Sequence, residues 1–349
     1  MPPRALTTVR DLIEAGLAPA ADEATLDAVA EAFRIRITPA MQSAIGADPA
    51  ADPVAQQFLP RPDELAIKDG ELDDPIGDSV HSPTRGLTHR YPDRVILAAT
   101  HTCEVYCRFC FRREKVGEEG ALPEADLSAA LDYIAATPAI HEVILTGGDP
   151  MVLSPRRIAA LLDRLAAIPH VDVVRFHTRI PVVAPERVTA DLVAALGRHP
   201  AVYVVIHTNH AQELTPEACA ALARLAGAGV PLLSQTVLLR GINDEVAALA
   251  ALFRTLVRNR VKPYYLHHCD LARGTSHFRT TIARGQALMA ALRGQISGLC
   301  LPTYVLDIPG GFGKVPIGPG HLEPVADGSW RVTDPSGRVH GYADPPGLP

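Results

Sequence analysis

Apolar residues follow two alternating patterns along this chain. Short apolar runs lie at 95–99, 142–146, 171–177, 202–207, 231–238 and 263–268. Between most of these runs, apolar residues recur at helical spacing, in segments at 123–136, 155–167, 185–196, 215–226 and 245–257. The runs predict buried strands, and the segments predict amphipathic helices. Strands that alternate with helices predict βαβ units and a parallel sheet.

Six strands of this kind predict an α/β fold built as a partial (β/α)6 barrel, because a complete barrel needs about eight. A doubly wound sheet is the alternative, but no Gly-rich turn follows the first strand. A further strand is predicted at 301–307, and segments 329–333 and 338–342 predict a terminal hairpin.

The two regions that flank the barrel differ from it in composition. Residues 5–36 have the apolar spacing of helices, and residues 39–92 are rich in Pro, Asp and Gly, which predicts an irregular connector. We therefore divide the chain into an N-terminal helical segment with its connector (1–88), the partial barrel (89–300) and a C-terminal segment (301–349).

Composition narrows the class of protein. The 349 residues are 47% hydrophobic and 21% charged, which is typical of a globular protein. A net charge of −6 provides no broad basic field, so nucleic acid is not an expected partner. No apolar stretch approaches the length of a membrane span, and six cysteines are too sparse for a disulfide framework. We expect a cytoplasmic protein.

Three cysteines in one short run carry the most specific chemistry. The run is Cys103-Glu-Val-Tyr-Cys107-Arg-Phe-Cys110. Three thiolates from one loop can hold a 4Fe–4S cluster and leave one iron open to another ligand. A structural zinc site, completed by a distant residue, is the alternative, but no second cysteine pair with zinc spacing occurs in the chain.

Polar residues follow each predicted strand, where parallel α/β proteins place their chemistry. Gly147-Gly-Asp149 follows the second strand, and His207, Gln235, Asp270 and Asp307 lie at the ends of later ones. The glycine pair serves either a tight turn or the close approach of a ligand to the backbone. His207 is either an ordinary loop histidine or a ligand-binding residue, and Asp307 is either a turn cap or a binding carboxylate.

Lys314 lies in a loop of small residues, Pro309-Gly-Gly-Phe-Gly-Lys314. A lysine is usually a solvated surface residue, but an amine in such a loop can also form a Schiff base with an aldehyde cofactor. Arg90, Tyr91 and Arg94, ahead of the first strand, supply cations and a hydroxyl that suit a phosphate. Together these residues suggest pyridoxal phosphate.

The spacing Cys103-x3-Cys107-x2-Cys110 resembles that of the radical S-adenosylmethionine (SAM) superfamily. Longer tracts resemble the lysine 2,3-aminomutase family over about residues 87–319. These tracts are His89-Arg-Tyr-Pro-Asp-Arg94, Cys107-Arg-Phe-Cys-Phe-Arg-Arg113, Pro263-Tyr-Tyr-Leu266, Cys269-Asp-Leu-Ala-Arg-Gly-Thr-Ser-His-Phe-Arg-Thr280 and Asp307-Ile-Pro-Gly-Gly-Phe-Gly-Lys314.

The resemblance implies an isomerase that moves the α-amino group of L-lysine from C2 to C3 and gives β-lysine. Its cofactors would be a 4Fe–4S cluster, SAM and pyridoxal 5′-phosphate, and its reductant a flavodoxin or ferredoxin. The implied cluster ligands are Cys103, Cys107 and Cys110, and the implied SAM contacts are Gly147, Gly148, Asp149, His207 and Gln235. The implied residues for pyridoxal phosphate are Lys314, Arg90, Tyr91 and Arg94, and those for the substrate are Arg112, Asp270 and Asp307.

Two departures and two alternatives accompany the resemblance. The longer family members bind zinc between subunits, but residues 321–349 contain no cysteine and Glu245 stands where the partner's ligand would be. We therefore predict no structural zinc, and at most a homo-oligomer without it. One alternative is the related enzyme that makes (R)-β-lysine for the modification of translation elongation factor P. The other is a non-catalytic Fe–S or zinc-binding protein, which would have no need of Lys314, Arg90 and Arg94.

Overall fold

One nine-stranded sheet, with its strands in chain order, organises the molecule. The computed structural model describes residues 4–117, 120–326 and 328–345. Strands β2 to β8 run parallel, and β1 and β9 pair antiparallel at the two edges. The strands of this sheet are β1 (Leu87–Tyr91), β2 (Arg94–Thr100), β3 (Glu142–Gly147), β4 (Val173–Thr178), β5 (Val202–His207), β6 (Leu232–Leu238), β7 (Val261–His268), β8 (Thr303–Asp307) and β9 (Lys314–Pro316).

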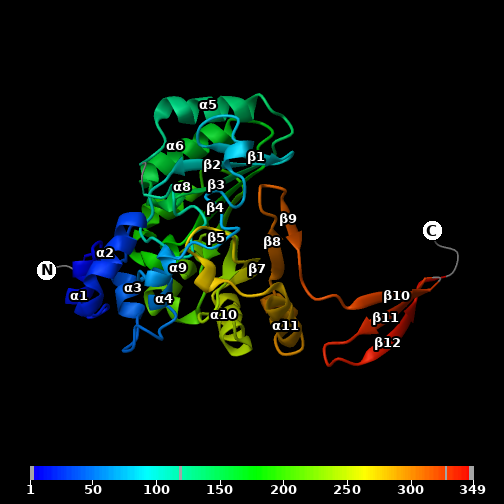
Figure 1. The fold of residues 1–349 in the computed structure, drawn as a ribbon. Coiled ribbons are helices and arrows are strands. Elements are labelled where there is room, and N and C mark those ends of the chain that lie inside the picture. The colour runs from blue at the N-terminus through cyan, green and yellow to red at the C-terminus, as the bar shows by residue number, and fades with distance from the viewer. Residues whose placement is uncertain (1–3, 118–119, 327, 346–349) are drawn as a thin grey trace.

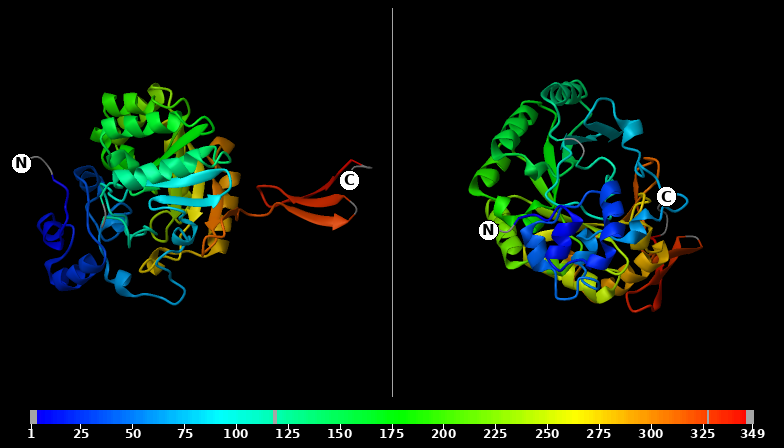
Figure 2. Two further views of the ribbon diagram at one scale, coloured as in Figure 1. Left: turned by 90° about the horizontal axis from the view of Figure 1, so that it is seen from above. Right: turned by 60° about the vertical axis from the view of Figure 1, so that its left-hand side comes forward.

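The sheet curls, and helices cover its outer side, as the views in Figures 1 and 2 show. The helices that connect its parallel strands are α5 (Glu124–Ala135), α6 (Pro155–Ala166), α7 (Ile180–Val183), α8 (Ala190–Leu196), α9 (Pro216–Gly227), α10 (Val246–Arg258) and α11 (Ile282–Arg293). Because each strand pairs with the next one in the chain, the doubly wound alternative is excluded. The predicted α/β partial barrel is confirmed, with β8 as a further parallel strand.

Local sequence signals account for several of these helix starts. Ser154 and Thr215 each cap a helix whose first residue is proline, and their hydroxyls accept hydrogen bonds from the N–H groups of Arg157 and Ala218. Proline suits this position because it lacks the N–H that would otherwise be unpaired there. We did not predict α11, in which few apolar residues mark a buried stripe.

Alternate residues of each strand face opposite sides of the curled sheet. Along β4 and β6, buried and half-buried residues alternate strictly. In β4, Val174 and Phe176 belong to the hydrophobic core, whereas Arg175 and His177 line a cavity on the other face. The period of two thus separates residues that stabilise the fold from residues that are free for chemistry.

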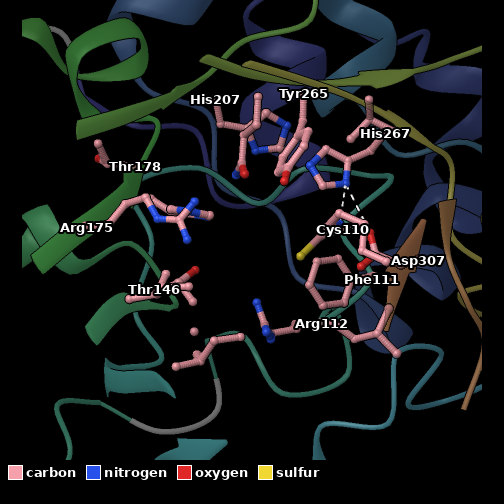
Figure 3. Close-up of a pocket in the computed structure, with 18 of the residues that line it drawn as sticks. Cys110, Phe111, Arg112, Thr146, Arg175, Thr178, His207, Tyr265, His267 and Asp307 are labelled. Atoms are coloured by element: carbon pink, nitrogen blue, oxygen red, sulfur yellow. Dashed lines mark hydrogen bonds and ion pairs between the residues drawn. The ribbon is translucent and has the colours of Figure 1, made fainter. Parts of the chain in front are cut away.

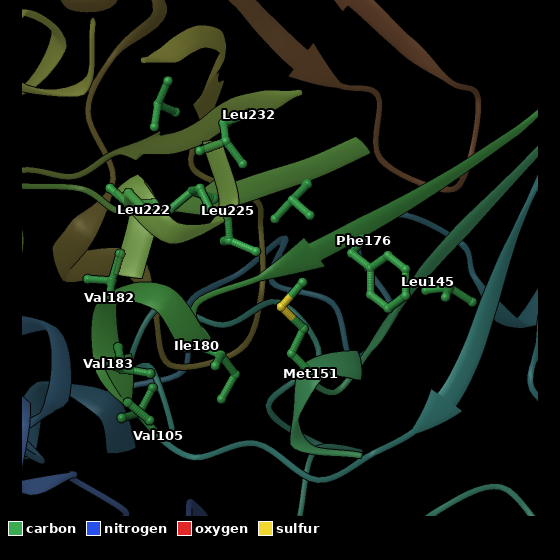
Figure 4. Packing of buried hydrophobic residues seen from close by; sticks show 14 of the residues in the cluster. Val105, Leu145, Met151, Phe176, Ile180, Val182, Val183, Leu222, Leu225 and Leu232 are labelled. Carbon is green, nitrogen blue, oxygen red and sulfur yellow. The ribbon is translucent and has the colours of Figure 1, made fainter. Parts of the chain in front are cut away.

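The core lies between the sheet and its outer helices. In Figure 4, Leu145 and Phe176 project from neighbouring strands into the same apolar cluster as Leu222 and Leu225 of α9. All four side chains are fully buried. Burial of each side chain contributes roughly 1.5–3 kcal/mol to the stability of the fold. This packing keeps the strand ends in fixed relative positions.

The N-terminal region confirms the predicted helices and corrects the predicted connector. Helices α1 (Val9–Glu14) and α2 (Glu23–Ala32) lie within the expected helical segment. The connector, expected to be irregular, contains α3 (Pro39–Ala44), α4 (Ala55–Phe58) and β1. We missed β1 because its sequence, Leu-Thr-His-Arg-Tyr, is polar, as is common at a sheet edge. Arg90 and Tyr91 therefore lie on a strand, not on a loop ahead of one.

A second sheet of three strands extends away from the barrel at the C-terminal end (Figures 1 and 2). Its strands are β10 (Leu322–Ala326), β11 (Ser329–Thr333) and β12 (Val339–Ala343). The predicted hairpin of β11 and β12 is confirmed, and β10 adds a strand that we did not predict. Among the described residues, no helix is long and apolar enough to cross a membrane.

Candidate active site

A cavity of about 970 Å³ occupies the concave face of the sheet, and every predicted site residue lines it. These residues come from most strands and from loops far apart in the chain. They are Arg90, Tyr91, Arg94, Cys103, Cys107, Cys110, Arg112, Gly147, Gly148, Asp149, His207, Gln235, Asp270, Asp307 and Lys314. Figure 3 shows Arg112, Arg175 and His267 reaching toward the same space from different elements.

The cysteine loop follows β2 and is anchored by the connector. Arg108, between two of the cysteines, is fully buried and forms an ion pair with the equally buried Glu64 over 2.6 Å. Its backbone N–H also donates to the carbonyl of Gln57 over 2.8 Å. We did not predict Glu64. Its carboxylate forms ion pairs with both Arg108 and Arg113, and these ion pairs hold the loop in place.

The three thiols face the cavity as neutral groups. Burial, followed by the proximity of Cys107, raises the pKa of Cys110 to about 11, because two thiolates so close together would repel each other. Burial also raises the pKa of Cys103 and Cys107. No group of three or more metal-ligating side chains among the described residues has the geometry of a metal site. Three thiols on one cavity wall still fit a cluster with three protein ligands, because metal binding deprotonates thiols and draws them together.

Arg179, directly after β4, is a neighbour of the cysteine loop. Its guanidinium donates to Sγ of Cys107 over 2.8 Å and pairs with the buried carboxylate of Glu213. Gln57 accepts a further hydrogen bond from it over 3.1 Å. A fixed cation beside a thiol stabilises the thiolate form that a cluster requires.

The glycine pair meets a structural demand at the end of β3. Gly147 has φ +103°, and a Cβ there would lie 2.6 Å from Cβ of Ala98. A Cβ on Gly148 would lie 2.5 Å from the carbonyl oxygen of Thr102. The pair thus lets β3 pack directly against the chain that leads into Cys103.

The Asp149 carboxylate is occupied by protein groups. It accepts hydrogen bonds from Oγ1 of Thr178 and the N–H of Arg179, both over 2.7 Å, and from the N–H of Met151 over 3.0 Å. Burial raises the pKa of Asp149, and these donors oppose the shift. Asp149 therefore ties the end of β3 to the end of β4.

Lys314, Asp307 and His267 form one hydrogen-bonded cluster. Asp307 and Lys314 are direct partners across β8 and β9, and their side chains form an ion pair. Nδ1 of His267 lies 3.1 Å from Oδ2 of Asp307 and 3.3 Å from Nζ of Lys314. Burial would raise the pKa of Asp307, but His267 and Lys314 outweigh it and hold that pKa well below its usual range. We did not predict His267, which lies within a strand and not after it.

The lysine loop is held against β1 and the connector. The Lys314 N–H donates to the hydroxyl of Tyr91 over 2.7 Å. Gly310 donates to the carbonyl of Pro75 over 3.0 Å, and a Cβ on Gly77 would lie 2.7 Å from the Gly310 backbone. The small residues of this loop therefore permit close packing on the connector.

Arg90 and Arg112 are joined by Asp78, which we did not predict. Arg90 Nη2 donates to Oδ1 of Asp78 over 3.2 Å, and Arg112 Nε donates to Oδ2 over 2.7 Å. The third predicted cation, Arg94, stacks on the ring of Tyr91 at 3.8 Å. The two sites expected for phosphate and for a substrate carboxylate thus share one anchoring carboxylate.

Asp270 faces the same cavity from the loop after β7. Burial, and then the negative charge of Asp307, raises the pKa of Asp270 to about 7. Lys314 and Arg112 lower it in part. Two neighbouring carboxylates with little exposure to solvent repel each other, and a cation bound between them would remove this repulsion.

Several buried polar atoms on the cavity wall have no hydrogen-bond partner among the described residues. They are Nε of Arg90 and Arg175 and Nε2 of His177, His207 and His267. Burial, followed by nearby arginines, holds the pKa of His177 and His207 well below the usual value, so both rings are neutral. Buried atoms of this kind normally have partners, so the cavity fits ligands rich in donors and acceptors, as SAM and pyridoxal phosphate are.

Comparison with known proteins gives this site its context. Residues 97–253 match the family model of the radical SAM superfamily, and residues 289–345 match that of lysine-2,3-aminomutase. The chain is 44% identical to the L-lysine 2,3-aminomutase of Fusobacterium nucleatum, over 84% of this chain and 69% of the relative. It is 39% identical to that of Clostridium subterminale, over 90% and 76%. It is also 38% identical to the glutamate 2,3-aminomutase of Clostridioides difficile, over 83% and 69%.

The curled sheet and its cysteine loop are those of a radical SAM enzyme. Within that class, the chain belongs to the lysine 2,3-aminomutase family, as the resemblance predicted. This family of isomerases uses a 4Fe–4S cluster, SAM and pyridoxal phosphate.

Proposed function

We propose that this chain is a lysine 2,3-aminomutase, an isomerase that moves the α-amino group of L-lysine from C2 to C3. The observation that carries the proposal is the placing of Lys314 and the acidic pair Asp270 and Asp307 in one cavity with the three cysteines. The cofactors of this family generate a substrate radical and supply a conjugated ring that stabilises the radical. The protein positions the reacting groups.

Each set of side chains has a separate task in this proposal. Cys103, Cys107 and Cys110 hold the cluster, and the backbone at Gly147 and Gly148 together with His207 and Gln235 faces SAM. Lys314 attaches pyridoxal phosphate, whose phosphate lies against Arg90, Tyr91 and Arg94. Support comes from the unpaired Nε of Arg90, which remains free to donate although Nη2 of the same side chain donates to Asp78 and Ile76.

The charges of the cavity favour lysine over glutamate. Arg112 would bind the α-carboxylate through the guanidinium nitrogens that Asp78 leaves free. The distal ammonium of lysine would bind between Asp270 and Asp307. Its positive charge would stabilise the ionised form of Asp270, whose pKa Asp307 raises. A glutamate side chain would place a third carboxylate there and be repelled.

A direct assay tests this proposal. The reconstituted protein is incubated without oxygen with SAM, dithionite and either L-lysine or L-glutamate, and the products are separated on a chiral column. β-Lysine from lysine alone is the expected result, and the enantiomer distinguishes a free (S)-β-lysine product from the (R)-product of the elongation factor P route. Absence of SAM cleavage would instead favour a non-catalytic Fe–S protein.

Further features bear on partners and location. Reduction of the cluster needs a one-electron donor, for which we propose a flavodoxin or ferredoxin. One face of the C-terminal sheet carries the cross-strand pair Trp330 and Tyr342, and Leu322, paired with Val332, lies on the same face. Leu322 and Tyr342 are more than half exposed, which supports a homo-oligomer that needs no metal. The six cysteines are free thiols, which supports a cytoplasmic location.

A further inference from the structure

His267 is the one neutral base that the structure places on the amine of Lys314. Among the described residues, only Asp307 and His267 are hydrogen-bond partners of Nζ. His267 comes from β7, the strand beside β8, and its Cα is paired with Val305, two residues before Asp307. Three successive strands, β7, β8 and β9, therefore each contribute one member of this cluster.

The ion pair with Asp307 creates a chemical difficulty for Lys314. An ammonium cannot attack an aldehyde, because its nitrogen has no free electron pair. Asp307 stabilises the ammonium, and as a carboxylate whose pKa lies well below its usual range it is a poor proton acceptor. A second group must therefore take the proton when the lysine reacts.

His267 has the geometry and the protonation state for this role. Its side chain is only 17% exposed, and its Nε2 has no partner among the described residues. Burial, followed by the Lys314 charge, lowers its pKa, so the ring is neutral. The ring packs edge-on against Tyr265 at 5.6 Å between centroids, which fixes Nδ1 toward Lys314. In Figure 3 the His267 ring points toward Asp307.

We propose that His267 is the proton acceptor and donor for imine exchange at Lys314. The inference deepens the proposed function, because it assumes that Lys314 attaches pyridoxal phosphate. With its ring proton on Nε2, His267 accepts a proton from the ammonium at Nδ1, and the new Nδ1–H then faces the Asp307 carboxylate. The freed electron pair of Lys314 forms the C–N bond to the aldehyde carbon. The aldehyde oxygen leaves as water with two protons, one from the amine nitrogen and one returned by His267. Charge and atoms balance, and Lys314 ends as a protonated imine that still faces Asp307.

The same step, run in reverse, serves substrate exchange. When a substrate amine displaces Lys314 from the cofactor, the departing lysine nitrogen regains a proton and needs a counter-ion. His267 can return the proton, and Asp307 then receives the ammonium in the arrangement that the structure contains.

Other charged groups around His267 set the conditions of a pH experiment. The cations are Lys314, Arg112 and Arg175, the anions are Asp307 and Asp270, and the neighbouring rings are His177, His207, Tyr264 and Tyr265. None of these is altered in the variants below.

The test follows imine formation, not turnover. Pyridoxal phosphate is mixed with cofactor-free protein in a stopped-flow instrument, and the imine absorbance is recorded between pH 6 and 9. Borohydride reduction and peptide mapping then locate the modified lysine. The variants are His267→Gln, His267→Ala and the control His268→Gln, whose Nδ1 instead contacts the hydroxyl of Tyr304 over 2.8 Å and which does not line the cavity.

We expect both His267 variants to form the imine about 100-fold more slowly at pH 7. Their rates should rise steadily with pH, since water must take the proton, while the control behaves as wild type. Added imidazole should restore the rate of His267→Ala, which a merely structural role would not allow. Unchanged rates in both His267 variants, slowing equal to that of His268→Gln, or no rescue by imidazole would overturn the inference. If wild-type protein forms no imine at Lys314, the cofactor part of the proposed function fails as well, and the two failures are thereby distinguished.

Discussion

Asp78 accepts a hydrogen bond from Nε of Arg112 over 2.7 Å. Its other carboxylate oxygen accepts from Arg90 over 3.2 Å, so one residue of the connector orients two cations of the cavity. Both arginine side chains are at most 13% exposed, and a buried charge of this kind depends on its partner.

Substitution of Asp78 should weaken substrate and cofactor binding together. In Asp78→Asn, Arg112 and Arg90 lose a charged acceptor and their side chains are less well fixed. We expect the KM for lysine and the Kd for pyridoxal phosphate each to rise about tenfold, which corresponds to roughly 1.4 kcal/mol. Fluorescence titration of the cofactor and steady-state kinetics measure the two effects. The control is Asp93→Asn, which removes the exposed ion-pair partner of Arg94 in the hairpin of β1 and β2. This change should alter neither the KM nor the Kd by more than about twofold.

Asp270 should make the cofactor-free protein less stable at alkaline pH. Because burial and Asp307 raise the pKa of Asp270 from 3.8 to about 7, the folded protein binds a proton that the unfolded chain has released. Stability from this group is thus complete below pH 4 and declines as the pH rises through 7. Asp270→Asn should raise the free energy of unfolding by roughly 2–4 kcal/mol at pH 8 and by less than about 1 kcal/mol at pH 4. Thermal melts at both pH values test this, with Asp132→Asn on exposed helix surface as the control. Equal effects at the two pH values would contradict the assignment.

Glu64 should be among the most costly charges to remove. It is fully buried and pairs with both Arg108 and Arg113, so Glu64→Gln leaves two buried guanidinium groups with reduced compensation. We expect a loss of about 3–5 kcal/mol in the free energy of unfolding by urea. The matched change Asp63→Asn breaks an exposed pair with Arg61 at 3.6 Å and should cost less than about 1 kcal/mol. A small effect at Glu64 would show that the cysteine loop does not depend on this anchor.

Gly148→Ala should impair assembly of the cluster. The added Cβ would lie 2.5 Å from the carbonyl oxygen of Thr102 and 2.6 Å from the carbonyl carbon of His101, and backbone atoms cannot move aside as a flexible side chain does. The displaced segment leads directly into Cys103. We expect iron and sulfide per chain to fall by half or more after anaerobic reconstitution. A strain of about 1 kcal/mol that opposes binding of the cluster is enough to reduce its occupancy by this amount. Gly227→Ala, where a Cβ meets nothing within 4 Å, should retain the wild-type content.

Contiguous motifs made much of the candidate site predictable. The cysteine run, Arg112 and the Lys314 loop are local in sequence, and each contains the residue types that its chemistry needs. The residues that we missed lack such a motif. Asp78 and Glu64 lie in a Pro-rich connector, where single carboxylates usually face solvent, and His267 lies inside a strand beside a second histidine that faces the other way.

The amino-acid sequence alone determined the alternation of strands and helices, the cysteine loop and the lysine loop, because hydrophobic periodicity and ligand spacing are properties of neighbouring residues. Only the tertiary structure decided which side chains share the concave face of the sheet. That choice depends on the phase of alternation in each strand, and in β7 on a register shift that turns both Tyr264 and Tyr265 toward the cavity. It depends also on the curl of the sheet, which brings β1, β7, β8 and β9 around one space, so that Lys314 meets His267 and Arg90 meets Asp78.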